Sequence, residues 1–387
     1  MFDYRKTLLH LQLISGIGPA TIEKLVQHLT LDMLAELYSY TARDFVERTN
    51  LSFDKAELLV KGLASTEILE KELALIERYA ISWTTVFDDD YPALLKAIYL
   101  PPVILYWKGA HPGSFEKALA VVGARAATSY AATCAQLLLS NVITQGVCIV
   151  SGGALGADAY AHELALSLGQ PTVAVIGSGL LKPYPAQNKN LFTRIIQNGG
   201  TLLSSFPLMT SPQATNFPAR NRIIAGLSSG CLVLQAAVKS GALITARYAL
   251  DQGREVGVVP GSITEPLSAG CHVLLSQGAH CITQPEEVFE LLGQFGQDFK
   301  QDFNKVVTAE PAQADLNTAR AARNTSRKSS DSPTRSPVAL FCDQPRTFDE
   351  ILENFSYEPT ELHTELFNLQ LSGELTQNIA GLWCAPI

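Results

Sequence analysis

The sequence predicts an α/β fold, an extended Rossmann-like, doubly wound and mostly parallel sheet with a helical N-terminal domain and a small winged-helix-like C-terminal domain. From residue 118 onward, short apolar runs alternate with glycine-containing turns and helical segments. This rhythm is typical of a parallel sheet covered by helices on both faces. The chain has 387 residues, of which 47% are hydrophobic, so it is long enough for two or three domains.

Residues 1–80 predict the helical domain. Apolar residues recur at helical spacing on both sides of the turn Ser15-Gly-Ile-Gly-Pro19. This turn is similar to a helix-hairpin-helix turn, whose backbone N–H groups can hold a phosphate. An ordinary turn between helices explains it at least as well, because Gly and Pro commonly separate helices.

Residues 81–295 form the predicted sheet domain. A proline-marked connector over 82–112 ends in an apolar strand at 103–109. Seven further strands are predicted at 119–122, 147–150, 172–176, 201–203, 231–234, 255–259 and 281–282. In such sheets ligands bind at the carboxyl ends of the strands, so the loops that follow these strands hold the candidate site.

Two segments follow the sheet domain. Residues 296–337 are rich in Ala, Ser, Thr, Pro and Arg and predict a flexible linker. Residues 338–387 predict two helices and a strand pair, which suggests a winged helix. This segment holds one base, Arg346, and eight acids, and its second helix, around 360–369, has no base. A DNA-reading winged helix normally carries bases there, so we expect a contact with a protein.

Composition excludes several classes of protein. The net charge of −8 gives no global basic signature, although the body of the chain before residue 338 is nearly neutral. The seven cysteines form no CxxC pair, which argues against a zinc site or a disulfide framework and fits a reducing cytoplasm. The N-terminus does not read as a signal peptide, and no apolar run reaches membrane-spanning length. We expect a cytoplasmic protein without a membrane, metal or cofactor.

The loops after the predicted strands are rich in Gly, Ser, Arg and Lys. They include Gly123-Ala-Arg125, Ser151-Gly-Gly-Ala-Leu-Gly-Ala-Asp158, Gly177-Ser-Gly179 and Lys239-Ser-Gly-Ala-Leu-Ile-Thr245. Small residues let a ligand approach the backbone, and exposed N–H groups can form anion sites. Each loop alone is weak evidence, but together they predict a phosphate-rich ligand.

The stretch 216–230 is the centre of this prediction. Pro218 is suited to the first turn of a helix, which places Arg220 and Arg222 near the helix N-terminus, where the dipole favours anions. Guanidinium groups and free helix N–H groups together make a phosphate site. The alternative is a pair of solvated arginines at a helix end.

Catalytic signatures are weak. The loop after the first predicted parallel strand lacks the Gly-x-Gly-x-x-Gly spacing of a nicotinamide enzyme, and a Gly-x-x-x-x-Gly-Lys-Ser/Thr loop is absent from the sequence. Asp158 could act as a base, but its place beside Gly156 predicts a helix N-cap. His162 falls within the following helix, and we expect a core or surface role. For His272 and His280 we favour packing or an interface over catalysis.

The motifs occur in an order that resembles a known family. Val121-Val-Gly-Ala-Arg125, the loop 151–158, Asn216-Phe-Pro-Ala-Arg-Asn-Arg-Ile-Ile-Ala-Gly226, Lys239–Ala246 and Val259-Pro-Gly-Ser262 follow one another. Over roughly 82–292 the chain is similar to the DNA-processing protein A family (DprA, also called Smf). The resemblance implies a homodimer, without turnover, that binds single-stranded DNA and loads the RecA recombinase during natural transformation.

The resemblance also implies site residues. The implied DNA-binding residues are Gly123, Arg125, Ser151, Gly152, Gly153, Gly156, Gly177, Gly179, Asn188, Lys189, Phe217, Arg220, Asn221, Arg222, Lys239, Ser240, Gly241 and Thr245. The implied dimer interface includes Cys271, Val273, Leu274 and His280. Candidate surfaces for base stacking are Tyr184, Phe206 and Phe217, although a place in the core explains Phe217 equally well.

This chain departs from the family pattern in places. Leu155 stands where the family usually has arginine, and Gln235 stands where glutamate is common. An alternative function stays open, because Rossmann-like enzymes of the phosphoribohydrolase type bind or hydrolyse nucleotides with similar Gly-Gly loops. Such an enzyme needs a catalytic carboxylate beside the loops, and there the sequence offers Asp158 alone.

Overall fold

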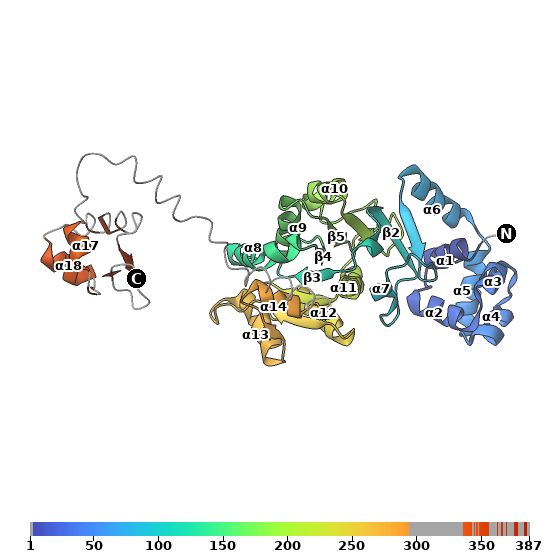
Figure 1. Cartoon of the computed structure of the whole chain (residues 1–387). Helices are drawn as coiled ribbons and strands as arrows, with labels where there is room; N and C mark the ends of the chain where they lie inside the picture. The colour runs from blue at the N-terminus through green and yellow to red at the C-terminus, as the bar shows by residue number, and fades with distance from the viewer. Residues whose placement is uncertain are drawn as a thin grey trace. The chain divides into compact units, whose positions relative to one another are not determined.

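A computed structural model describes residues 3–293 continuously and residues 336–384 with gaps (Figure 1). The later described residues are 336–342, 344, 346, 348–355, 362, 365, 366, 369, 375–377, 383 and 384. The chain divides into two compact units, Met1–Ala309 and Glu310–Ile387. The predicted linker at 296–337 lies, up to residue 335, outside the described residues.

A nine-stranded sheet lies at the centre of the first unit, in the order β1-β2-β6-β5-β4-β3-β7-β8-β9. The strands are β1 (Ser82–Thr85), β2 (Ile104–Gly109), β3 (Ala118–Val122), β4 (Cys148–Ser151), β5 (Thr172–Val175), β6 (Thr201–Ser204), β7 (Gly230–Val233), β8 (Glu255–Val258) and β9 (His280–Cys281). Strands β3 to β9 are parallel, whereas β2 pairs antiparallel with both β1 and β6. The mostly parallel sheet predicted from the alternating pattern is therefore confirmed.

One strand was missed. Strand β1 lies in the stretch that we predicted to be an extended, proline-marked connector, and it pairs with β2 from Ser82 opposite Trp107 to Thr85 opposite Ile104. Its Trp-Thr-Thr sequence has high β propensity. We assigned the whole stretch to a connector because of its prolines. These prolines, Pro92, Pro101 and Pro102, belong to the loop that follows the strand.

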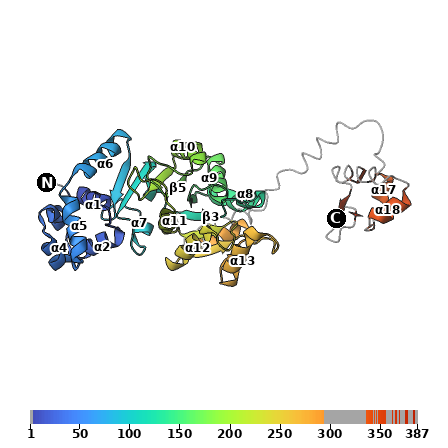
Figure 2. The ribbon, with the colours of Figure 1, turned by 180° about the vertical axis from the view of Figure 1, so that it is seen from behind.

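Helices cover both faces of the sheet (Figures 1 and 2). Leu119 and Val121 of β3 pack with helices α8 (Ser129–Thr144), α9 (Ala157–Ser167) and α14 (Pro285–Glu290). The alternate residues Ala120 and Val122 pack on the other face with α11 (Asn216–Gly226), α12 (Gly241–Asp251) and α13 (Ala269–Ser276). Side chains alternate across a strand, so an uninterrupted apolar strand is buried on both faces, as a doubly wound fold requires.

The N-terminal helices share a core with one end of the sheet. They are α1 (Tyr4–Leu13), α2 (Pro19–His28), α3 (Leu31–Glu36), α4 (Ala42–Thr49), α5 (Phe53–Leu63) and α6 (Glu67–Arg78). One apolar cluster joins them to β2, β5, β6 and α10 (Lys189–Gln197). Two polar contacts reinforce this packing: Gln12 Nε2 donates to Ser205 O at 2.6 Å, and Leu208 N donates to a carboxylate oxygen of Glu72 at 2.8 Å.

Short elements complete the first unit. They are α7 (Ala93–Lys96) and the 3-10 helices η1 (Leu37–Ser39), η2 (Pro112–Ser114), η3 (Ala186–Asn188) and η4 (Pro266–Ser268). Among the residues that the structure describes, no helix combines the length and the apolar character needed to cross a bilayer.

The described part of the second unit contains α17 (Pro337–Phe341), α18 (Phe348–Asn354) and an antiparallel pair, β10 (Thr376–Gln377) and β11 (Trp383–Cys384). These elements surround a small apolar cluster that includes Val338, Ile351 and Leu366. Helix α18 and the strand pair fall where a helix and a strand pair were predicted, whereas α17 was not predicted. Most of the second predicted helix, around 360–369, lies outside the described residues. The winged-helix arrangement stays a prediction.

Candidate nucleic-acid interface

A pocket of about 480 Å³ lies at the carboxyl ends of β3 and β7. From β3 the chain continues to β4, β5 and β6 on one side of the sheet, and it then returns to β7 on the other side of β3. The pocket therefore lies at the point where the strand order reverses, which is the usual ligand site of an open α/β sheet. The predicted location of the site agrees with this cavity.

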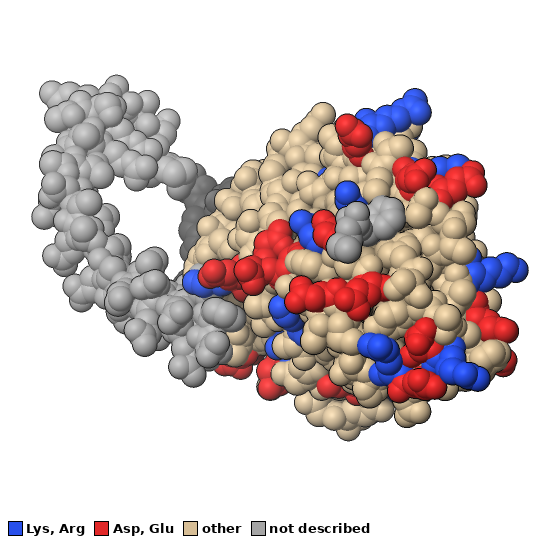
Figure 3. Space-filling view, turned by 90° about the vertical axis from the view of Figure 1, so that its right-hand side faces the viewer, with Lys and Arg blue, Asp and Glu red and all other residues tan. Residues whose placement is uncertain are grey.

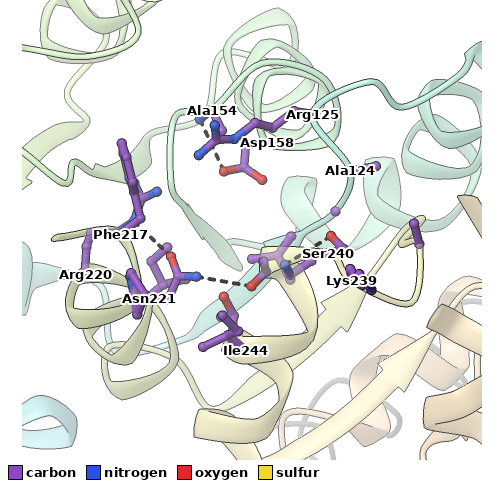
Figure 4. Close-up of a pocket in the computed structure, with 18 of the residues that line it drawn as sticks. Ala124, Arg125, Ala154, Asp158, Phe217, Arg220, Asn221, Lys239, Ser240 and Ile244 are labelled. Carbon is purple, nitrogen blue, oxygen red and sulfur yellow. Dashed lines mark hydrogen bonds between the residues drawn. The ribbon is translucent and has the colours of Figure 1, made fainter. Parts of the chain in front are cut away.

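Loops distant in sequence line this pocket (Figure 4). They come from the turn after β3, the start of α11 and the connection between β7 and α12. The candidate residues that line it are Gly123, Arg125, Phe217, Arg220, Asn221, Lys239, Ser240, Gly241 and Thr245. The structure thus brings half of the implied DNA-binding residues into one cavity, including three of the cations.

Arg125 and Lys239 are the exposed cations of the pocket. Figure 4 shows Arg125 on one side of the cavity and Lys239 across from it. Neither side chain forms an ion pair within the described ranges. The Arg125 guanidinium carbon lies 5.2 Å from the centroid of the Phe217 ring, a cation–π distance. Both cations are therefore available to an anionic ligand.

Arg220 has a different environment, because its side chain is only 5% exposed. Its Nη1 donates to the carbonyl oxygens of Gly152 and Val175, and its Nε donates to Asn221 Oδ1 at 3.0 Å. Burial lowers the pKa of Arg220 to about 10, and the nearby Asp158 carboxyl opposes this shift. These hydrogen bonds connect the loop after β4 to the end of β5. The remaining nitrogen of Arg220, Nη2, makes no hydrogen bond among the described residues.

Asp158 organises the same loop and is not the helix cap that we predicted. The N-cap of α9 is Gly156, and Asp158 is the second residue of the helix. Its buried Oδ2 accepts the backbone N–H groups of Gly152 at 3.1 Å and Ala154 at 3.3 Å. Burial raises the pKa of Asp158, against the lowering effects of Arg220 and these hydrogen bonds.

Gly152 is enclosed between this acid and this base. A Cβ atom at Gly152 would lie 2.6 Å from Asp158 Oδ2 and 2.8 Å from the Arg220 guanidinium carbon. Glycine is therefore needed because the backbone passes between two buried charged groups, and the requirement is one of packing. The same close packing explains Gly156, whose Cβ would meet the carbonyl oxygens of Ala124 and Arg125.

Pro218 lies in the first turn of the central helix, as predicted, but the two arginines do not lie in that turn. Helix α11 begins at Asn216, so Pro218 is its third residue and Arg220 lies beyond the first turn. The dipole argument for an anion beside Arg220 therefore does not apply. Arg222 does not reach the pocket: its Nη1 donates to the carbonyl oxygens of Tyr99 and Leu100, and it lines a separate cavity beside the N-terminal helices.

Other candidate residues build the loops around the pocket. Ser151 Oγ donates to Val121 O at 2.5 Å, and Asn188 Nδ2 donates to the carbonyl oxygens of Gly153 at 2.9 Å and Ala154 at 3.1 Å. Gly177 packs against Phe217, and Gly179 packs against the backbone of Pro207 and Leu208. Lys189 is exposed at the start of α10 and does not line the pocket.

Aromatic rings form one wall of the site. The centroids of Tyr184 and Phe217 are 5.9 Å apart, with a tilt of 50° between the rings. Tyr184 is 40% exposed and lines a small recess beside the main pocket, together with Leu155 and Arg125. The third stacking candidate, Phe206, lines the cavity that holds Arg222.

Sequence reasoning missed several apolar residues of the pocket, among them Ala126, Ala154, Ile244 and Leu267. Their types are common in any core, so no sequence signal distinguishes them. Of the implied dimer residues, Cys271 and Leu274 are buried, whereas Val273 is 37% exposed. His280 is exposed and lies 2.8 Å from a carboxylate oxygen of Glu255.

On the N-terminal face, the Lys and Arg residues that the structure describes are not concentrated around one cavity. Figure 3 looks onto this face and shows Lys and Arg side chains scattered among Asp and Glu. The turn between α1 and α2 is present, with Gly16 at a φ of 84°. Its role as a phosphate site stays a prediction, whereas the cations of the sheet pocket lie together.

Comparison with known proteins supports this description. The family model of DNA recombination-mediator protein A matches residues 82–293. Protein Smf of Escherichia coli is 38% identical over 305 residues, covering 79% of this chain and 78% of the relative. The DNA processing protein DprA of Streptococcus pneumoniae is 42% identical over 204 residues, covering 53% of this chain and 72% of the relative. The X-ray structure of the S. pneumoniae protein has a TM-score of 0.64 with 32% identity, covering 74% of this chain and 97% of that chain. The chain therefore belongs to the DNA recombination-mediator protein A family, also called DprA or Smf.

Proposed function

We propose that the pocket at the end of β3 and β7 binds the phosphate backbone of single-stranded DNA. The observation that carries this proposal is the pair of exposed cations, Arg125 and Lys239, on opposite sides of a cavity at the switch point of the sheet. They come from separate loops, so the fold itself sets their separation. The family name supports DNA as the polyanion.

The aromatic wall supports a single strand over a duplex. Tyr184 and Phe217 present ring surfaces beside Arg125, and stacking on such rings is worth about 1–3 kcal/mol per base. Bases of a single strand are free to reach these rings, whereas bases of a duplex are stacked on one another. Stacking tolerates any base, so we expect little sequence preference from this wall.

The surroundings of Asp158 argue against the nucleotide-hydrolysing alternative. Asp158 is the acid among the described residues that line the pocket. Its Oδ2 holds the backbone of the loop after β4, and its side chain is 6% exposed. A general base must reach its substrate directly or through one water. We propose that this carboxylate shapes the loop and that the protein binds DNA without turnover.

Membership of the family supports further proposals about partners. We propose that the protein acts in the cytoplasm during natural transformation, that it delivers the bound strand to RecA, and that it works as a homodimer. The dimer surface would include Val273 and His280, which are exposed, and not the side chains of Cys271 and Leu274, which are buried. If this surface pairs two copies, Val273→Glu should reduce the mass measured by light scattering; an unchanged dimer would contradict it.

The main proposal is tested by comparing ligands under one condition. Fluorescence anisotropy should show tighter binding of a thymidine oligomer than of a duplex of equal length. Incubation with nucleoside monophosphates should release no free base. Free base without oligomer binding would support the enzyme instead. Delivery to RecA is measured separately, as the rate of RecA filament formation on strands that were first covered by a single-strand binding protein.

A further inference from the structure

Lys239 lies in a tight turn between β7 and α12. A hydrogen bond from Ser240 N to Ala237 O at 2.9 Å closes this turn, and its two central residues, Val238 and Lys239, are exposed. The Lys239 side chain makes no hydrogen bond or ion pair with any residue that the structure describes. Its position is therefore set by the backbone of the turn and by the groups that hold the two ends of the turn.

Each end of this turn is held by a hydrogen bond from another part of the fold. Before the turn, Ala236 O accepts the backbone N–H of Gly270, the second residue of α13, at 2.8 Å. After the turn, Gly241 O accepts a hydrogen bond from Nδ2 of Asn221 at 3.2 Å. The first contact joins two backbones, whereas the second depends on a single side chain. Replacing Asn221 therefore releases the end of the turn that lies two residues from Lys239.

The Asn221 amide is held at both of its ends. Its side chain is only 9% exposed, and its Oδ1 accepts a hydrogen bond from Nε of Arg220 at 3.0 Å. An arginine nitrogen can only donate and a backbone carbonyl can only accept, so these two contacts fix which way the amide points. Arg220 is itself bound to the carbonyl oxygens of Gly152 and Val175. The amide thus connects the turn that carries Lys239 to a buried guanidinium that is anchored in the sheet (Figure 4).

The absence of charge on Asn221 distinguishes two possible roles. The salt dependence of DNA binding reports how many phosphates are neutralised by cations of the protein. A lost hydrogen bond from a neutral amide to the ligand weakens binding but leaves this number unchanged. Replacing Asn221 by another neutral residue therefore alters the salt dependence only if a cation moves away from its phosphate.

We propose that Asn221 is a positioning residue, which holds the Lys239 ammonium against a phosphate of the bound strand by fixing the carbonyl of Gly241. Without this hydrogen bond, the turn and its lysine sample more positions, and ordering them on the ligand costs conformational entropy. This inference rests on the proposed function. It replaces the direct DNA contact that the family resemblance implies for Asn221 with an action through Lys239.

The test is a double-variant cycle, measured by fluorescence anisotropy with a thymidine oligomer across a salt series. Asn221→Leu alone should flatten the slope of log affinity against log salt by about 0.7, as for one lost phosphate contact, although the charge of the protein is unchanged. Adding Lys239→Ala to Asn221→Leu should flatten the slope no further. Adding Arg125→Ala to Asn221→Leu should flatten it by about 0.7 more, because Arg125 lies on a separate loop.

Asn198→Leu is the matched control. Asn198 is exposed at the end of α10, away from the pocket, and its Nδ2 also donates to a backbone carbonyl, that of Arg194, at 2.7 Å. This variant should leave the slope unchanged. If Asn221→Leu does not fold, as judged by circular dichroism, Asn221→Asp takes its place, because it keeps an acceptor for Arg220 Nε and loses the donor to Gly241 O. In Asn221→Asp, Lys239→Ala should likewise have no effect on the slope.

Three results would overturn the inference. Weaker binding by folded Asn221→Leu with an unchanged slope would make Asn221 a direct contact of the ligand. An unchanged slope with unchanged affinity would show that the turn holds its shape without Asn221. Full flattening by Lys239→Ala in either Asn221 variant would show that Lys239 is positioned independently. If neither Lys239→Ala nor Arg125→Ala altered the slope of the otherwise unaltered protein, the proposed function itself would fail.

Discussion

Replacing Arg220 by methionine should destabilise the protein more than it alters the electrostatics of DNA binding. The change removes the Nη1 hydrogen bonds to the carbonyl oxygens of Gly152 and Val175 and leaves Asp158 buried without its neighbouring positive charge. Leaving a buried polar group without its hydrogen-bond partner typically costs about 1–3 kcal/mol. We therefore expect Arg220→Met to lower the free energy of unfolding by about that amount.

A double-variant cycle isolates the contribution of the acid. Asp158→Asn removes the unpaired charge while its amide oxygen can still accept the N–H of Gly152. The destabilisation by Arg220→Met should therefore be smaller in the Asp158→Asn background, by about 0.5–3 kcal/mol as for neighbouring residues. Arg220→Lys keeps the charge but not the planar fork, and we expect an intermediate stability.

The assay is urea unfolding followed by circular dichroism, with oligomer affinity measured only where each variant is folded. A phosphate contact contributes about 0.7 to the slope of log affinity against log salt on single strands. We expect Arg220→Met to change this slope by less than that amount, because only Nη2 is left to a ligand. The structural role of Arg220 would be refuted if Arg220→Met were as stable as the unaltered protein and its slope of log affinity against log salt were flatter by about 0.7.

Three further predictions concern other parts of the chain. His162 is buried, burial lowers its pKa to about 3, and it lies 2.8 Å from Thr172 Oγ1. In the unfolded chain His162 takes up a proton below its ordinary pKa of 6.5, so the free energy of unfolding should decrease by about 1.4 kcal/mol for each unit by which the pH falls between 6.5 and about 3. In urea melts at a series of pH values, His162→Asn should lose this dependence. An identical pH profile in the variant would contradict the prediction. Tyr184→Ala should weaken all oligomers by about 1–3 kcal/mol without changing the salt slope, whereas base-selective loss in titrations would contradict stacking. Ending the chain near residue 295 should keep most of the affinity in anisotropy titrations, and a large loss would show that the linker or C-terminal segment contacts DNA.

Most of the sheet could be predicted because its strands are short, apolar and separated by glycine turns. The rule that ligands bind at the carboxyl ends of strands then predicted where the pocket lies. It also predicted that Arg125 and Lys239 line the same pocket. Strand β1 could not be found this way, since its partner β2 lies across a proline-marked loop. Pairing between strands depends on contacts that a local pattern does not contain.

Roles within the site were harder to predict than its location. Arg220 and Arg222 are two residues apart on α11, so they point to different sides of the helix. Arg220 is buried beneath the pocket, and Arg222 contacts the carbonyl groups of Tyr99 and Leu100. The sequence shows two cations in one motif, but only the packing around them reveals which hydrogen bonds they already make.

The central claim is that Arg125 and Lys239 hold phosphates of a single strand. It is tested most directly by measuring the affinity for a thymidine oligomer across a salt series, for the unaltered protein and for Arg125→Ala and Lys239→Ala. Each substitution should flatten the slope of log affinity against log salt by about 0.7 and weaken all oligomers alike. Unchanged slopes in both variants, with the fold intact, would show that this pocket does not bind a nucleic-acid backbone.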